Sequence, residues 1–327
     1  RESSFLFNNL LLLGIGFATF WGTIFPILSE AVRGVKITVG PPFYNQVNVP
    51  IGLALLALTG IGPVIAWRKA SLSNLKNCFI KPVIIALVAA GALFPFVPLK
   101  DKPEILTYVA FVLCVFVMST ILIEFYKGAS ARMELQSETF VGALCSLVWR
   151  NKRRYGGYIV HIGMVLIFAG IAGSSSYSTE TQKHLKIGDS IEIRDYTLTY
   201  KKLTAVEASD IKTRIIAELE VTKDRQKIWS ARPEKEFYKG QKQPTSEVSL
   251  YSTWKEDLYV VLADFREDES ATVKVHVNPM VSWLWYGQWV IAFGTIICLW
   301  PDRLEQRRRL ERLRQQDTIF EREQVGL

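Results

Sequence analysis

The apolar residues of this chain are gathered in long blocks that polar stretches separate. A membrane-spanning helix needs about 20 predominantly apolar residues, and six blocks approach that length, at 5–28, 51–67, 82–99, 105–125, 155–174 and 281–300. The second and third blocks are short and contain glycine and proline, so their ends are poorly defined. The pattern predicts about six transmembrane helices.

The polar stretch between the last two blocks has a different period. Apolar and polar residues alternate there, which is typical of half-buried strands, at 190–193, 196–200, 215–222, 247–251, 258–262 and 272–277. Five to seven short antiparallel strands predict a small open barrel or sandwich. The chain is therefore predicted to be a polytopic α-helical membrane protein with an extramembrane, mainly-β domain between the last two helices.

This pattern gives a simple division of the chain. Residues 1–174 form a transmembrane region, 175–280 the β-rich domain, 281–300 the last span and 301–327 a basic tail. Helical spacing of apolar residues over 129–149 predicts a helix along the membrane interface, and 303–316 shows a similar spacing. Gly40, Pro41 and Pro42 predict a stiff, extended turn that ends in the aromatic pair Phe43 and Tyr44.

The charges assign sides to these segments. The net charge is +8, and the basic residues concentrate at 68–81, 127–154 and 303–314. The positive-inside rule makes those three segments cytoplasmic and the β-rich domain external. The charge therefore indicates membrane lipid as the partner and gives no support to nucleic acid.

The cysteines and acids exclude several kinds of chemistry. None of the four cysteines lies in the β-rich domain, and no Cys-x-x-Cys occurs, so disulfides of that domain, thiol exchange and zinc through paired cysteines are unsupported. Paired acids for hydrolysis, a phosphate-binding glycine loop and a nucleophile elbow are also absent near the spans. Acidic residues within the spans are scarce, which argues against an ion pump.

One histidine lies inside a predicted span. His161 follows the basic flank 150–154 by several apolar positions, and an ionisable residue at that depth marks a functional site by default. Gly156, Gly157 and Gly163 surround it with small residues, where a neighbouring helix or a flat ligand could approach. Three interpretations stay open: a haem or other metal ligand, an interhelical hydrogen bond, and a proton relay.

The other two histidines have more ordinary surroundings. His184 lies in a polar stretch and is predicted to be a solvated surface residue. His276 alternates with Val275 and Val277 and so points to the opposite face of its strand. Trp283, Trp285 and Trp289 follow at the outer end of the last span, as interfacial anchors or as a stacking wall.

Four motifs, in chain order, resemble the carboxy-terminal half of the CcmF family, the membrane component of the system I cytochrome c haem lyase. They are Arg1 to Phe5 with Asn8 and Asn9, Val39 to Asn45, Arg153 to His161, and Asn278 to Trp283. The resemblance extends over essentially the whole chain. It implies that the protein lies in a bacterial inner membrane with its β-rich domain facing the periplasm.

The resemblance also implies a role for His161. It occupies the position of the second of two transmembrane histidines that hold a haem b in the lyase, with Gly157 and Gly163 as flanking cofactor-binding positions. The family receives haem from the chaperone CcmE and attaches it to the thiols of apocytochrome c. The haem b is proposed to keep the incoming haem iron reduced.

The chain departs from the family in one respect. The tryptophan-rich haem-handling segment, Trp-Gly-x-x-Trp-x-Trp-Asp, does not occur among its nine tryptophans. We therefore expect a natural split subunit or a fragment, inactive in thioether formation without the amino-terminal half of the lyase and the other maturation subunits. The alternatives are a secondary transporter subunit that uses His161 as a proton relay, and a non-catalytic assembly scaffold.

Overall fold

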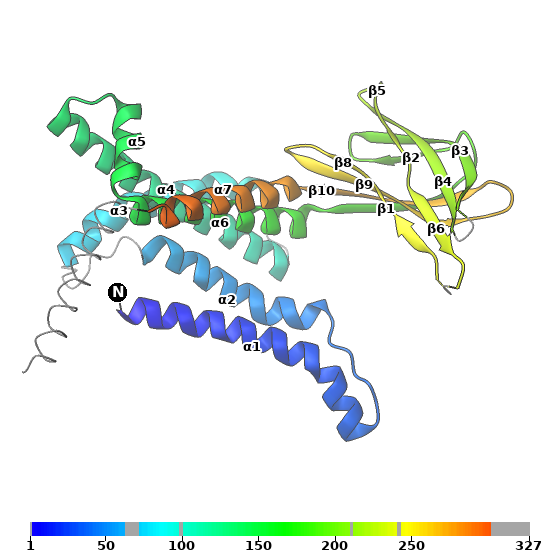
Figure 1. The fold of residues 1–327 in the computed structure, drawn as a ribbon, viewed down its shortest axis with the longest axis horizontal. Helices are drawn as coiled ribbons and strands as arrows, with labels where there is room; N and C mark the ends of the chain where they lie inside the picture. The colour runs from blue at the N-terminus through cyan, green and yellow to red at the C-terminus, as the bar shows by residue number, and fades with distance from the viewer. Residues whose placement is uncertain (1, 63–71, 98–100, 210–211, 241–242, 302–327) are drawn as a thin grey trace, which may run out of the picture. The chain divides into compact units, whose positions relative to one another are not determined.

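The structure is a computed structural model, and it describes residues 2–62, 72–97, 101–209, 212–240 and 243–301 (Figure 1). Helices and strands follow one another as the hydropathy pattern predicts, with all strands between the last two helices. The helices are α1 (Glu2–Arg33), α2 (Pro41–Ile61), α3 (Leu72–Leu93), α4 (Lys102–Gln136), α5 (Phe140–Arg150), α6 (Lys152–Tyr177) and α7 (Val281–Leu299). A single 3₁₀ turn, Phe94–Phe96, follows α3.

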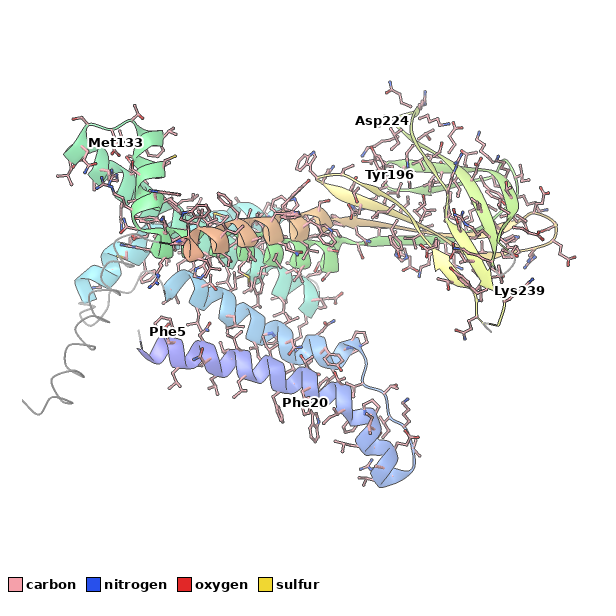
Figure 2. All side chains as sticks on the ribbon, viewed as in Figure 1. Phe5, Phe20, Met133, Tyr196, Asp224 and Lys239 are labelled. Atoms are coloured by element: carbon pink, nitrogen blue, oxygen red, sulfur yellow. The ribbon has the colours of Figure 1, made fainter. Side chains whose placement is uncertain are left out.

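The described residues contain four helices that are long and apolar enough to cross a membrane, namely α1, α4, α6 and α7. The second and third predicted spans overlap α2 and α3 only in part, because both helices begin about ten residues before the predicted spans. Large apolar side chains cover the outside of these helices; Phe20 on α1, labelled in Figure 2, is 60% exposed. Such surfaces are stable only against lipid or another apolar partner, so the polytopic membrane fold class is confirmed.

Two helices begin earlier than predicted. The extended turn expected at Gly40-Pro41-Pro42 is wrong, because α2 already begins at Pro41 with Gly40 as its N-cap. Proline fits the first helical turn, where its fixed φ suits the helix and its missing N–H is not needed. Pro82 likewise lies inside α3 rather than at its start. The basic tail and its predicted helix at 303–316 lie outside the described residues.

The single interfacial helix expected over 129–149 is also wrong, since the chain turns between α4 and α5. Ser137 has a positive φ of 50°, which ends α4. Thr139 then caps α5 by accepting a hydrogen bond from the Gly142 backbone N–H at 3.3 Å. Arg132 donates two hydrogen bonds to the Glu138 carboxylate, at 3.1 and 2.6 Å, and these bonds stabilise the turn. Apolar spacing alone does not reveal such a break.

The chain divides into two compact units. One contains Arg1–Ile121 and Met164–Gln288, and the other contains Leu122–Gly163 and Trp289–Leu327. In the first unit α1 lies beside α2 (Figure 1), and the phenol of Tyr44 occupies the space where a Cβ on Gly22 would lie. The second unit contains α5 together with the adjoining parts of α4, α6 and α7.

The β domain consists of two antiparallel sheets (Figure 1). One has the strand order β1-β10-β9-β8, and the other β2-β3-β4-β6-β7 with β5 paired to β4. The bounds are β1 (Thr179–Leu185), β2 (Ser190–Ile193), β3 (Tyr196–Ser209), β4 (Lys212–Lys223), β5 (Gln226–Ala231), β6 (Glu234–Tyr238), β7 (Thr245–Glu247), β8 (Ser249–Ser252), β9 (Glu256–Phe265) and β10 (Ala271–Pro279).

Alternating side chains build the core of this domain. Val273, Val275 and Val277 of β10 are fully buried, as are their register partners on β9, Leu262, Val260 and Leu258. Alternate residues of β3 and β4 complete the same cluster. All six predicted strands are present, whereas β1, β5, β6 and β7 were not predicted. The β4–β5 hairpin turns at Asp224 and Arg225, both with positive φ (Figure 2), as a tight hairpin turn requires.

A buried carboxylate joins the β domain to the helices that flank it. The Glu256 side chain is 6% exposed and accepts hydrogen bonds from Arg194 at 3.3 Å and from the Tyr196 hydroxyl at 3.1 Å. Arg194 also donates to the backbone oxygen of Tyr177, the last residue of α6. Burial and the Glu256 charge raise the pKa of Tyr196, so its hydroxyl keeps the proton that it donates.

We expect the β domain to lose stability in acid through Glu236. Hydrogen bonds from Lys212, at 2.5 Å, and from Tyr238, at 2.8 Å, hold the pKa of Glu236 below its ordinary value of 4.5. A carboxyl with a depressed folded pKa stabilises the fold above its unfolded pKa, and this stabilisation disappears as the pH falls through the folded value. Stability should therefore hold down to about pH 5 and fall below it.

Urea unfolding of the full chain in detergent, followed by circular dichroism at several pH values, measures this effect. Glu236→Gln should flatten the acid limb, whereas Glu192→Gln, at an exposed position on β2, should leave it unchanged. An identical acid limb in the wild type and in Glu236→Gln would contradict the assignment.

Candidate functional site

His161 lies in the third turn of α6, within the second unit. Its side chain is partly buried, and its Nδ1 is a buried nitrogen without a hydrogen-bond partner among the described residues. Buried polar groups are almost always paired, and each exception calls for an explanation. A hydrogen-bond partner for this nitrogen, or a ligand for the ring, must therefore come from outside the described residues.

The surface of α6 beside His161 is open. Gly157 precedes His161 by four residues and so lies on the same face of the helix. A Cβ built on Gly157 would meet nothing within 4 Å. No side-chain atom, the His161 imidazole included, comes within 4 Å of that Cβ position, so the helix surface at Gly157 is free. We call Gly157 and His161 together the open strip.

A different face of α6 packs tightly against α7. A Cβ on Gly156 would lie 2.7 Å from the Cys298 sulfur and 3.1 Å from the Gly294 carbonyl oxygen. A Cβ on Gly294 would lie 2.8 Å from the Val160 backbone nitrogen and 2.9 Å from the Gly156 oxygen. The two backbones are therefore in direct contact, as small residues permit between membrane helices. This contact leaves α6 little freedom to rotate.

Aromatic side chains pack another face of α6 against α4. Phe125 lies 5.1 Å from the Tyr155 ring centroid and 6.0 Å from that of Tyr158. Arg154 adds an ion pair with Glu124 at 2.8 Å. With α4 on one side and α7 on another, the open strip is the face of α6 that these contacts leave uncovered within the unit.

Gly163 does not belong to the open strip. It follows His161 by two residues, which places it about 200° around the helix, and it is buried. The sequence predicted that Gly157 and Gly163 would flank the ligand together. The helix geometry keeps Gly157 beside His161 and places Gly163 on the other side of α6.

The other histidines lie in the β domain. His184 on β1 is exposed, with Nδ1 3.2 Å from the Thr272 hydroxyl of β10. His276 on β10 contacts Glu180 at 3.5 Å and the edge of the Tyr259 ring. Val275 and Val277 on either side of His276 are buried, so the predicted alternation of faces is correct.

Within the residues that the structure describes, no three His, Cys, Asp or Glu side chains come close enough to hold a metal ion. A metal centre built from this part of the chain alone is therefore unsupported. A haem needs only one or two axial ligands from the protein. An unpartnered imidazole beside an uncovered glycine fits one axial ligand of such a group.

Sequence reasoning missed three residues that shape this site. Glu124 has a side chain 12% exposed and pairs with Arg154, although the sequence showed it only as one acid at the end of a span. Gly294 and Cys298 of α7 were not singled out. Their spacing of four residues, small-x-x-x-small, was the signal that could have found them.

The fold defines a polytopic helical membrane protein with a β-sandwich inserted before its last helix. A family model described as the CcmF C-terminal beta-sandwich matches residues 176–279. The chain is 28% identical over 305 residues to the cytochrome c-type biogenesis protein CcmF of Haemophilus influenzae. The aligned region covers 93% of this chain and 45% of that protein. The CcmF of Escherichia coli is 25% identical over 307 residues. The chain is thus similar to the carboxy-terminal part of CcmF.

Two further comparisons agree with this result. The solved structure of the cytochrome c heme lyase CcmF superimposes with a TM-score of 0.69 at 24% identity, over 92% of this chain and 46% of that one. The cytochrome c-type biogenesis protein NrfE of Haemophilus influenzae is 24% identical over 311 residues. The chain spans about 45% of the length of these curated relatives.

Proposed function

We propose that this chain is part of a haem lyase that attaches haem to apocytochrome c during cytochrome c maturation. In this proposal His161 is one axial ligand of a haem b within the membrane. The observation that carries it is the buried Nδ1 of His161, which lacks a partner among the described residues and lies beside the uncovered Gly157. The relatives, which are named for cytochrome c-type biogenesis, support the same assignment.

The residues around His161 fit the needs of a ligand. An axial imidazole gives one nitrogen to the iron and uses the other as a hydrogen-bond donor that fixes the ring; an acceptor for Nδ1 would have to come from outside the described residues. The backbone contact of Gly156 with Gly294 and the aromatic contacts of Tyr155 and Tyr158 with Phe125 fix α6. Gly157 leaves space for a flat group close to the helix. A bound haem would supply a one-electron redox couple at this place.

The remaining parts of the lyase are supplied by other chains or segments. We infer that the second axial ligand comes from the amino-terminal half of the lyase. Haem would be delivered by CcmE and transferred to apocytochrome c, with the other maturation subunits in the same assembly. The sandwich at 175–280 would face the periplasm from the bacterial inner membrane, consistent with the distribution of basic residues between the spans.

An absorption spectrum of the complex tests this function. The chain is co-expressed with the amino-terminal half of the lyase, purified, and examined in its reduced form for the Soret band of a b-type haem. Formation of a reporter c-type cytochrome is measured in the same cells. A complex without haem that mediates pH-dependent uptake would instead indicate a transporter. Binding of an apocytochrome that His161→Ala does not affect, without any haem, would indicate a scaffold.

A further inference from the structure

A cavity lies where α5 passes into α6, beside the end of α7. Its volume is about 450 Å³, and residues 150–154 and 298–301 line it. All of these residues belong to the second unit. The volume falls within the range of about 300–1,000 Å³ that is usual for small-molecule sites. The cavity is therefore large enough for a phosphodiester and its neighbouring glycerol.

The lining is strongly positive. Among the described residues it contains four basic side chains, Arg150, Lys152, Arg153 and Arg154, and no carboxylate. Arg154 is paired with Glu124 at 2.8 Å. The described lining is therefore predominantly basic. The first backbone N–H groups of α6, which begins at Lys152, add the positive end of the helix dipole.

Besides Asn151 and Cys298, the rest of the lining is apolar or aromatic. Leu299, Trp300 and Pro301 form the side contributed by the end of α7. Trp300 lies 6.1 Å from the ring of Trp149, and Lys152 lies 4.4 Å above the Trp149 ring. Both tryptophans are more than half exposed, at 61% and 53%. Exposed tryptophans at the ends of membrane helices lie at the level of the lipid headgroups.

We propose that this cavity binds the phosphate group of an anionic membrane phospholipid. The guanidinium groups supply bidentate phosphate contacts, and the Trp149–Trp300 pair provides an apolar wall for the start of the acyl chains. A free phosphate would use the cations but leave that wall uncovered. This inference is independent of the proposed haem ligation, because it uses no residue of the open strip.

The test measures lipid that stays with the protein. The full chain is purified from its own membranes in a mild detergent, and phosphatidylglycerol and cardiolipin that remain bound are measured by native mass spectrometry. Arg150→Gln/Arg153→Gln should lower the retained anionic lipid about thirtyfold, since each of the two basic residues near a membrane surface contributes about 1 kcal/mol. Retention of phosphatidylethanolamine should not change.

The matched control is Lys76→Gln/Lys81→Gln, which removes two basic residues that do not line the cavity and should retain lipid like the wild type. Size-exclusion chromatography checks that both variants stay folded. Equal lipid retention in the wild type and in Arg150→Gln/Arg153→Gln overturns the proposal. So does inorganic phosphate that displaces all bound lipid at millimolar concentration, because the site would then recognise the free anion.

Discussion

We expect the variant His161→Ala to abolish the b-type haem band of the proposed lyase complex. The substitution removes the imidazole, and the described residues hold no group of three His, Cys, Asp or Glu side chains that could bind a metal in its place. Reduced-minus-oxidised spectra of the purified complex measure the loss. Maturation of a reporter cytochrome should fall together with the band, because the variant changes the ligand and leaves the packing faces of α6 intact.

Two other variants separate ligation from general damage. His276→Ala removes a histidine that contacts Glu180 and Tyr259 in the β domain, and it should keep the full band. His161→Met offers a thioether, and axial methionine raises the haem potential. It should restore part of the band at a higher midpoint potential. A His161→Ala complex with an undiminished band would refute haem ligation by this residue.

The second large effect is expected at the contact between α6 and α7. Gly294→Leu places a side chain where even a Cβ would lie 2.8 Å from the Val160 nitrogen and 2.9 Å from the Gly156 oxygen. Both obstacles are backbone atoms, which cannot rotate away, so the helices must separate. Overpacking of this kind costs about 3 kcal/mol, at the upper end of the usual range. The thermal unfolding midpoint of the chain in detergent should fall markedly.

Gly16→Leu is the matched control for this variant. Gly16 is also a helical glycine, on α1, but a Cβ there meets nothing within 4 Å. This variant should unfold at the wild-type temperature or slightly above it, because leucine has the higher helix propensity. If both variants behave alike, the α6–α7 contact does not limit stability.

Much of this fold can be predicted from hydropathy and period alone. A run of about 20 apolar residues has few stable structures other than a membrane-spanning helix. The alternation at Val273, Val275 and Val277 requires one face of the strand to be buried. The unpredicted strands lacked that signal. β1, for example, exposes most of its residues, and its pairing with β10 depends on backbone hydrogen bonds that any sequence can make.

The candidate site shows a similar division. The depth of His161 in an apolar run was sufficient to single it out. Burying an imidazole in a membrane interior is costly whichever apolar residues surround it. Helical spacing places Gly157, but not Gly163, on the face of α6 that carries His161. Which faces α4 and α7 cover could be learned only from the tertiary structure.

The amino-acid sequence by itself thus determined the membrane class and the insertion of a β domain before the last helix, and it singled out His161 as the candidate ligand. These features follow from local composition and period, which need no knowledge of distant contacts. Only the tertiary structure decided the break at Ser137, the approach of Gly294 to Val160 and the uncovered face at Gly157. Each of these depends on side-chain contacts or on backbones brought together from distant parts of the chain.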